Sequence, residues 1–171
     1  MMKQKIEDAF NAHLNAEAFS AYLYMSMSAY FQSINMKGMG HWMRLQADEE
    51  TMHQMKFFDY ILARGGKVVL DQINAPQTEW ESPLAAFEAA LAHEEMISDK
   101  INKLVDLSLE ESDHASNAFL QWFVTEQVEE EESVSEIVDQ LKIVEKDGGA
   151  LFMLDRELGQ RAAAAGTTEG A

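Results

Sequence analysis

Four glutamates and one histidine occupy positions from which they could bind metal ions together. Each glutamate lies midway along an apolar stripe of helical period, and His53 follows Glu50 by three residues. The four are Glu17, Glu50, Glu94 and Glu130. Buried carboxylates without a positive partner are costly, so four in one core need shared cations. Their charge matches two divalent ions, and carboxylates with one imidazole suit iron, manganese or zinc.

The second half of the chain repeats the spacing of the first half. One offset of 77 residues relates four pairs of positions: Glu17 and Glu94, Glu49 and Glu126, Glu50 and Gln127, and His53 and Glu130. Two similar helical hairpins, packed about a pseudo-twofold axis, would place the two halves of a metal pair opposite each other. The repeat therefore predicts a two-ion site shared by all four helices.

Long helices must position these side chains. Helical periodicity covers residues 3–33, 39–64, 83–111 and 114–146, and a shorter apolar segment covers 150–158. Short links within each pair imply antiparallel neighbours, whereas about 17 residues between helices 2 and 3 can cross the bundle. We expect an all-α, antiparallel four-helix bundle with a long crossover between helices 2 and 3 and a short fifth C-terminal helix. Residues 68–70 are an extended candidate within the crossover.

Composition excludes several classes of function. The chain has 171 residues, 13 Lys and Arg against 30 Asp and Glu, a formal net charge of −17 and no cysteine. A thiolate metal site and a thiol nucleophile are therefore excluded, and the scarcity of basic residues argues against nucleic acid as a partner. No apolar run is long enough to cross a membrane, and no signal peptide is recognisable. We expect one domain over residues 1–160, a disordered tail over 161–171, and a cytoplasmic location.

The chain resembles the prokaryotic non-haem ferritins, within the ferritin-like di-iron superfamily, over about residues 5–158. The resemblance rests on the Glu-x-x-His motif of Glu50 and His53, on the Gln-x-x-Glu motif of Gln127 and Glu130, and on five matching runs. The runs cover residues 15–17, 22–24, 49–53, 119–123 and 126–131. This resemblance implies a ferritin-like four-helix bundle with the two-ion site inside each subunit.

The resemblance implies which side chains hold the two iron ions of each subunit. One ion is expected at Glu17, Glu50 and His53. The other is expected at Glu50, Glu94 and Glu130, so Glu50 bridges the pair. This arrangement is asymmetric, because the fourth helix supplies a glutamate where the second helix supplies a histidine.

Further side chains receive roles from the same resemblance. A third iron position would use four glutamates, namely Glu49, Glu126, Glu129 and Glu130. Tyr24 would lie beside the pair, form a hydrogen bond there and supply an electron, and Gln127 would complete the motif of the fourth helix. For Glu49, Glu126 and Glu129 a solvated acidic face stays open as an alternative, and Tyr24 could equally be a core residue.

The implied function is iron storage with ferroxidase activity. Fe(II) would be oxidised by dioxygen, with hydrogen peroxide as a second candidate oxidant, and the ferric product stored as mineral inside a shell of 24 subunits. Haem is not expected. Haem-containing relatives carry methionine directly after the bridging glutamate, where this chain has Thr51, and histidine where it has Glu130.

Three other functions are weighed against this one. A rubrerythrin-like peroxide reductase usually carries an additional iron domain with four cysteines, and this chain has none. A twelve-subunit miniature ferritin that protects DNA builds its site between subunits. A non-catalytic bundle that only binds divalent metal ions would show metal-dependent melting without turnover. The remaining histidines, His13, His41, His93 and His114, are interpreted as structural.

Overall fold

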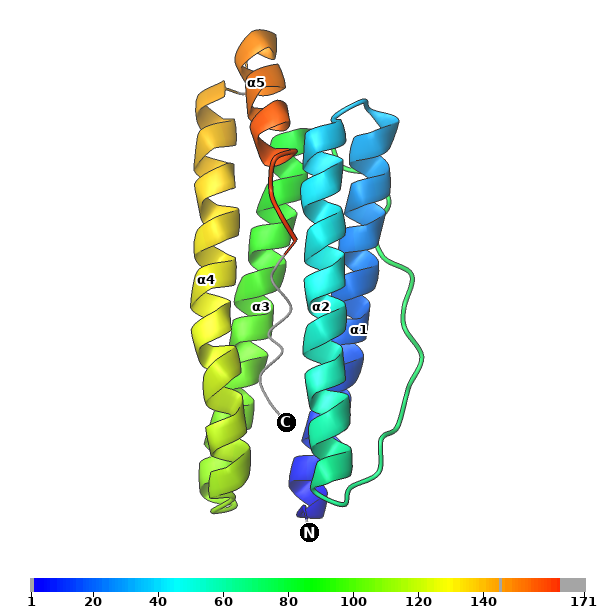
Figure 1. Cartoon of the computed structure of the whole chain (residues 1–171), viewed down its shortest axis with the longest axis vertical. Coiled ribbons are helices and arrows are strands. Elements are labelled where there is room, and N and C mark those ends of the chain that lie inside the picture. Colours follow the sequence, from blue (N-terminus) through cyan, green and yellow to red (C-terminus); the bar gives the residue numbers. More distant parts are fainter. Residues whose placement is uncertain (1, 145, 164–171) are drawn as a thin grey trace.

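The computed structural model describes residues 2–144 and 146–163, and the described part contains helices and no strand. Its elements are α1 (Gln4–Ser33), α2 (Lys37–Ala63), α3 (Pro83–Glu110), α4 (His114–Val144) and α5 (Gly148–Leu158). The first four form a bundle in which α1 packs along α2 and α3 packs along α4, with α5 at one end (Figure 1). The expected all-α bundle with its short fifth helix is confirmed.

The long crossover between α2 and α3 runs along the outside of the bundle beside α1 (Figure 1). No strand forms at residues 68–70, which we expected to be extended. Instead, two asparagines of α1 satisfy its backbone. Asn11 donates to the Lys67 carbonyl at 2.9 Å and accepts from the Val69 amide at 2.7 Å. Asn15, one helical turn further along α1, donates to the Val69 carbonyl at 2.9 Å and accepts from the Asp71 amide at 2.8 Å.

Local signals explain where several helices begin and end. Ser82 caps α3 by accepting from the Ala85 amide at 3.1 Å, and Pro83 follows at the first helical position. Beyond α2, Gly65 adopts a φ of 72°, and the Gly66 amide donates back to the Ile61 carbonyl at 2.9 Å. That left-handed turn is a common helix ending, and it directs the chain into the crossover.

The apolar core consists of two clusters separated by a polar layer. One cluster surrounds Tyr24, Phe31 and Phe87, and the other surrounds Phe10 and Phe57 nearer the start of α1. Along each of the four long helices, the central polar residues lie between the positions that contribute to the two clusters. The bundle therefore holds its polar centre rigidly between two packed apolar layers.

The fifth helix is fixed to the start of α2. The Asp155 side chain accepts a hydrogen bond from the Met39 amide at 2.9 Å, which satisfies a donor at the α2 N-terminus. Gly38 of α2 and Gly159 after α5 let the two backbones approach closely. A Cβ on Gly38 would lie 1.6 Å from the Asp155 carbonyl oxygen, and a Cβ on Gly159 would lie 3.2 Å from the Cα of Gly38. The chain then turns back toward α2 (Figure 1). Arg161, the first residue of the expected disordered tail, contacts α2, and residues 164–171 of that tail lie outside the described part.

None of the described helices is long and apolar enough to span a membrane.

Candidate metal centre

The five side chains at the centre of the bundle come from all four long helices. Glu17 lies on α1, Glu50 and His53 on α2, Glu94 on α3 and Glu130 on α4. Each is 6% exposed or less. The helical stripes inferred from the sequence therefore place these polar groups inside the bundle, where water cannot compensate their charges.

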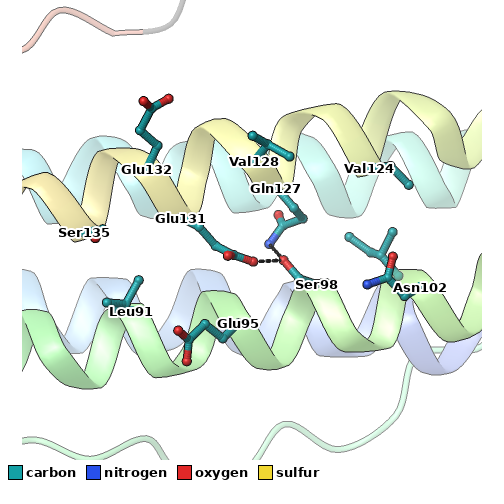
Figure 2. Close-up of a pocket in the computed structure, with 11 residues that line it drawn as sticks. Leu91, Glu95, Ser98, Asn102, Val124, Gln127, Val128, Glu131, Glu132 and Ser135 are labelled. Atoms are coloured by element: carbon teal, nitrogen blue, oxygen red, sulfur yellow. Dashed lines mark hydrogen bonds between the residues drawn. The ribbon is translucent and has the colours of Figure 1, made fainter.

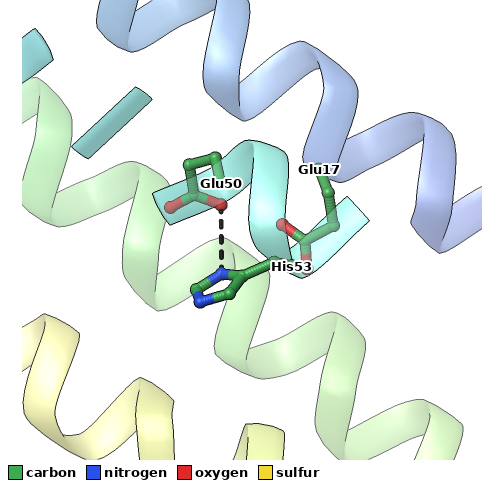
Figure 3. A group of neighbouring side chains, drawn as sticks. All are labelled: Glu17, Glu50 and His53. Carbon is green, nitrogen blue, oxygen red and sulfur yellow. Dashed lines mark ion pairs between the residues drawn. The ribbon is translucent and has the colours of Figure 1, made fainter. Parts of the chain in front are cut away.

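Three of the five side chains approach one another closely. Glu17, Glu50 and His53 each offer one ligand atom, and these atoms lie within 4.8 Å of one another. Figure 3 shows the three groups pointing toward a common point, with the Nδ1 of His53 3.5 Å from an oxygen of Glu50. Two carboxylates and an imidazole at this separation are suited to bind one divalent ion.

The burial, contacts and charge of the Glu17 carboxylate suit it to bind a cation. Both of its oxygens are buried, and neither accepts a well-directed hydrogen bond from a described residue. Its close contact is with His13, whose Nε2 lies 2.8 Å from Oε1. Burial raises the pKa of Glu17, but the nearby imidazoles of His13 and His53 outweigh that effect, so the pKa lies below its ordinary value. A charged, buried carboxylate whose oxygens accept no well-directed hydrogen bond, and whose close contact is one imidazole, fits a metal ligand.

The second predicted set is less closely gathered. Glu94 accepts hydrogen bonds from the Tyr24 hydroxyl and, at 3.2 Å, from the Gln127 amide. Glu130 accepts one from the Gln46 amide. Among the described residues, the other close group of potential ligands is His53, Glu126 and Glu130, rather than the expected Glu50, Glu94 and Glu130. Glu94 and Glu130 thus lie at the centre of the bundle, but their carboxylates point toward the donors Tyr24, Gln127 and Gln46 rather than toward Glu50.

Burial controls the protonation of the central carboxyls. It raises the pKa of Glu50 to about 8, and the charge of Glu17 adds to this effect while the His53 hydrogen bond opposes it. Burial likewise raises the pKa of Glu94 and of Glu130 to about 8, reinforced by the charge of Glu50 at Glu94 and of Glu94 at Glu130. These carboxyls repel one another when charged, so they retain protons at neutral pH.

Histidine 53 responds in the opposite direction. Burial lowers the pKa of His53, but its hydrogen bond to Glu50 and the charges of Glu50, Glu17 and Glu130 outweigh burial and raise the pKa to about 10. Its ring is enclosed by Trp122 and Phe123, with ring centroids 5.5 and 5.9 Å away. The imidazolium is therefore an internal cation that partly replaces the ions the site is suited to hold.

Tyrosine 24 lies directly beside the centre. It is fully buried, and its hydroxyl donates to Glu94. Burial, followed by the charges of Glu94 and Glu50, raises the pKa of Tyr24 well above its ordinary value. The phenol therefore stays protonated and orients Glu94.

The three acidic residues expected at a third position lie at the edge of the centre. Glu126 is partly buried, which raises its pKa, and the charges of Glu129 and Glu49 raise it further while His53 opposes them. Glu49 is also partly buried, whereas Glu129 is exposed. Glu49 binds Arg161, with a guanidinium nitrogen 2.6 Å from the carboxylate. The negative side chains are thus close enough to influence one another.

Three residues that contact the centre or its edge were not identified from the sequence. His13 was interpreted as structural, although its position four residues before Glu17 on one helix face was a usable signal. The contact between Gln46 and Glu130 and the contact between Arg161 and Glu49 join segments distant in the chain. Helical periodicity carries no information about such pairs.

A groove of about 460 Å³ lies between α3 and α4, outside the central layer (Figure 2). Glu131 accepts a hydrogen bond from the Ser98 hydroxyl, and the Gln127 amide donates to the same hydroxyl oxygen at 3.3 Å. Because Gln127 also donates to Glu94, this groove is separated from the central carboxyls by a single side chain.

The fold and the centre define a class: four-helix bundles whose buried, carboxylate-rich centre is a candidate metal site. A family model described as "Ferritin-like domain" matches residues 7–144. The chain belongs to this ferritin-like family.

Similar proteins agree with this assignment. A bacterial non-heme ferritin of Bacteroides fragilis is 41% identical over 161 residues, covering 94% of this chain and 100% of that protein. A probable bacterial non-heme ferritin-like protein of Haemophilus influenzae is 36% identical, covering 93% and 96%. An open pore ferritin of Archaeoglobus fulgidus superposes with a TM-score of 0.94 at 48% identity, covering 95% of this chain and all of that one.

Proposed function

We propose that this protein is an iron-storage ferritin with ferroxidase activity, located in the cytoplasm. Fe(II) is its substrate, dioxygen the oxidant, and a ferric mineral inside a shell of 24 subunits the stored product. The observation that carries the proposal is the buried carboxylate of Glu17, whose oxygens accept no directed hydrogen bond beside Glu50 and His53. The relatives named non-heme ferritin support the choice of iron over other divalent ions.

The proposed site holds two Fe(II) ions in each subunit. Glu17, Glu50 and His53 bind the first ion, and Glu50 together with Glu94 and Glu130 binds the second. In the proposed site, small rotations bring one oxygen of Glu94 and one of Glu130 to the shared ion. Carboxylate oxygens are hard ligands, so they stabilise the ferric product more than the ferrous substrate.

A pair of ions matches the electron requirement of the oxidant. Each Fe(II) gives up one electron, and two electrons with two protons convert dioxygen to hydrogen peroxide. The carboxyls of Glu50, Glu94 and Glu130 hold protons in the metal-free protein, and these leave when iron binds. The second oxidant, hydrogen peroxide itself, accepts two electrons and two protons to give two water molecules.

Neighbouring side chains position the ligands. We assign Tyr24 and Gln127 to the orientation of Glu94, because both donate to its carboxylate. Tyr24 is also the proposed source of one electron and its phenolic proton; with one electron from each of three Fe(II) ions, this gives the four that convert dioxygen to two water molecules. Glu49, Glu126 and Glu129, with Glu130, form the proposed third iron position on the path away from the pair. Two observations support this third position: the charges of Glu129 and Glu49 raise the pKa of Glu126, and Glu126 lies in a close group with Glu130 and His53.

The proposed shell explains how an acidic protein concentrates its substrate. Twenty-four chains with a charge of −17 each carry a formal charge of −408, and charge lining an enclosed cavity attracts cations. The similarity over the full length of the A. fulgidus ferritin supports assembly into a shell.

The test is rapid oxidation of two Fe(II) per chain, followed by stopped-flow absorbance after mixing metal-free protein with aerated buffer. We expect fast oxidation in the unmodified protein and at least a tenfold slower rate in Glu50→Ala, which removes the bridging ligand. The matched control is Glu88→Ala, which removes an exposed glutamate of α3 and should leave the rate unchanged. Equal, slow oxidation in all three proteins would refute the ferroxidase assignment.

A parallel measurement separates the proposal from peroxide reduction. Anaerobic protein loaded with two Fe(II) per chain is mixed with either dioxygen or hydrogen peroxide. A rate that is much faster with peroxide and negligible with dioxygen would favour a peroxide reductase over a ferroxidase.

A further inference from the structure

A single arginine links the end of α5 to the acidic edge of the metal centre. Arg161 lies three residues beyond Leu158, and its guanidinium makes three contacts with α2. Nη2 donates to Oε2 of Glu49 at 2.6 Å, and Nη1 donates to Oε1 of Gln46 at 3.0 Å and to the Trp42 carbonyl at 3.4 Å. These contacts fix both the plane and the direction of the guanidinium.

The arginine is held from its other side as well. Its guanidinium carbon lies 4.5 Å from the centroid of the Trp42 ring. Its backbone carbonyl accepts from the Nε2 of His41 at 3.0 Å. The side chains of Arg161 and Glu49 are only 24% and 13% exposed. This is a fixed, half-buried ion pair, unlike the freely solvated arginines whose surface pairs contribute little.

Glu49 is also part of an acidic group suited to a cation. Its charge, with that of Glu129, acts on Glu126, and Glu126 lies with Glu130 and His53 in a close group of potential metal ligands. Lys56, which also acts on Glu126, lies over the Trp122 ring, 4.1 Å from its centroid. Arg161 is therefore the positive group that, among the described residues, directly binds an oxygen of Glu49.

We propose that Arg161 acts as a built-in competitor for the third metal position. Its guanidinium occupies an oxygen of Glu49 that a third ion would use, and a metal ion bound there displaces it. The inference rests on the third position in the proposed function. The segment after α5 thereby lowers the affinity of the third position relative to the pair, so that the pair fills first.

Gln46 connects this competitor to the pair. Its amide oxygen accepts from Arg161 while its amide nitrogen donates to Glu130. Release of Arg161 removes one of the two contacts that fix the Gln46 amide, and the oxygen of Glu130 that Gln46 holds becomes available to the third ion. Arg161 and Gln46 are positioning residues in this scheme, because neither contacts the reacting ions.

The test uses Zn(II) as a redox-inactive probe, titrated calorimetrically into the metal-free, full-length protein. The unmodified protein should bind two ions tightly and a third more weakly in each chain. Arg161→Ala should tighten the third event about fivefold, the equivalent of one partly exposed ion pair, and leave the first two unchanged. Arg161→Lys, which keeps the charge and loses the planar fork, should tighten it less.

Arg156→Ala is the matched control, because it removes the same charge from an exposed position of α5 and should leave the third event unchanged. Glu49→Gln should weaken the third event alone. Third-ion binding that is unchanged or weaker in Arg161→Ala and Arg161→Lys would overturn the proposal. Absence of the two tight events would instead count against the di-iron pair, so the two failures are distinguishable.

Discussion

Protons and the proposed metal ions would compete for the same oxygens at the centre of the bundle. Burial and mutual repulsion raise the pKa of Glu50, Glu94 and Glu130 to about 8, and their neighbours raise the pKa of His53 to about 10. Glu17 is the exception, because the imidazoles beside it keep its pKa low. At neutral pH the metal-free centre therefore has one charged carboxylate prepared for an ion, and other ligands that must first lose protons.

Metal binding should consequently release protons. Between pH 6.5 and 7.5 Glu50, Glu94, Glu130 and His53 are largely protonated in the metal-free protein, while ligands bind as the deprotonated forms. Zn(II) affinity should therefore rise with pH, and more protons should be released per chain at pH 6.5 than at pH 7.5. Calorimetric titrations of Zn(II) in two buffers of different ionisation enthalpy measure the number of protons released per chain.

Glu130→Gln provides the control for this release, because an amide has no proton to lose at this pH and the number released should fall. Zn(II) binding with no proton release at either pH would contradict the raised pKa values.

Contacts of Gly38 and Asp155 at the junction of α2 and α5 explain where α2 begins. Glycine disfavours helix interiors, so the sequence predicted that helix 2 begins at residue 39, whereas α2 begins at Lys37. Asp155 of α5 supplies a hydrogen bond to the Met39 amide, and Gly38 leaves room for the Asp155 carbonyl. Tertiary contact thus overrides local preference, and no window of sequence around residue 38 contains that contact.

The same reasoning separates what the sequence predicts from what it does not. Periodicity placed Glu17, Glu50, Glu94 and Glu130 inside the bundle, because one helical turn fixes which face a side chain occupies. The hydrogen bonds from Asn11 to the crossover and from Arg161 to Glu49 depend on segments returning from far along the chain. The rotation of Glu94 and Glu130 toward Tyr24 and Gln46 is likewise a matter of side-chain conformation that the helical pattern leaves open.

Gly38→Ala should destabilise the contact between α2 and α5. The new Cβ would lie 1.6 Å from a backbone oxygen, so one helix must shift and lose the Asp155 hydrogen bond, at a cost of about 2 kcal/mol. Gly148→Ala is the matched control, since nothing lies within 4 Å of its added Cβ, and the change should stay within about 0.5 kcal/mol.

Denaturant unfolding of the metal-free variants measures both substitutions at the α2–α5 junction. Equal stability of Gly38→Ala and Gly148→Ala would show that α5 adjusts without loss.

At the scale of the whole molecule, a single chain leaves apolar surface uncovered. Ile143 at the end of α4 is 84% exposed, and Met153 and Phe152 on α5 are 62% and 57% exposed. The first two line a groove of about 880 Å³ between the two helices. Exposed apolar side chains that line a groove indicate an interaction site, in a protein that is otherwise strongly acidic. Its location away from the metal centre is consistent with a role in subunit assembly rather than chemistry.

Ile143→Glu should therefore weaken assembly without disturbing the metal centre. The substitution removes a side chain whose burial contributes about 1.5–3 kcal/mol, and a closed symmetric assembly repeats that loss at every equivalent contact. Gln140→Glu adds the same charge to the same groove but removes no apolar group, so it isolates the contribution of burial. Sedimentation velocity should show smaller species for Ile143→Glu alone, with tight Zn(II) binding per chain retained. If both variants assemble like the unmodified protein, this groove lies outside the subunit contacts, and the acidic chains must associate through another face.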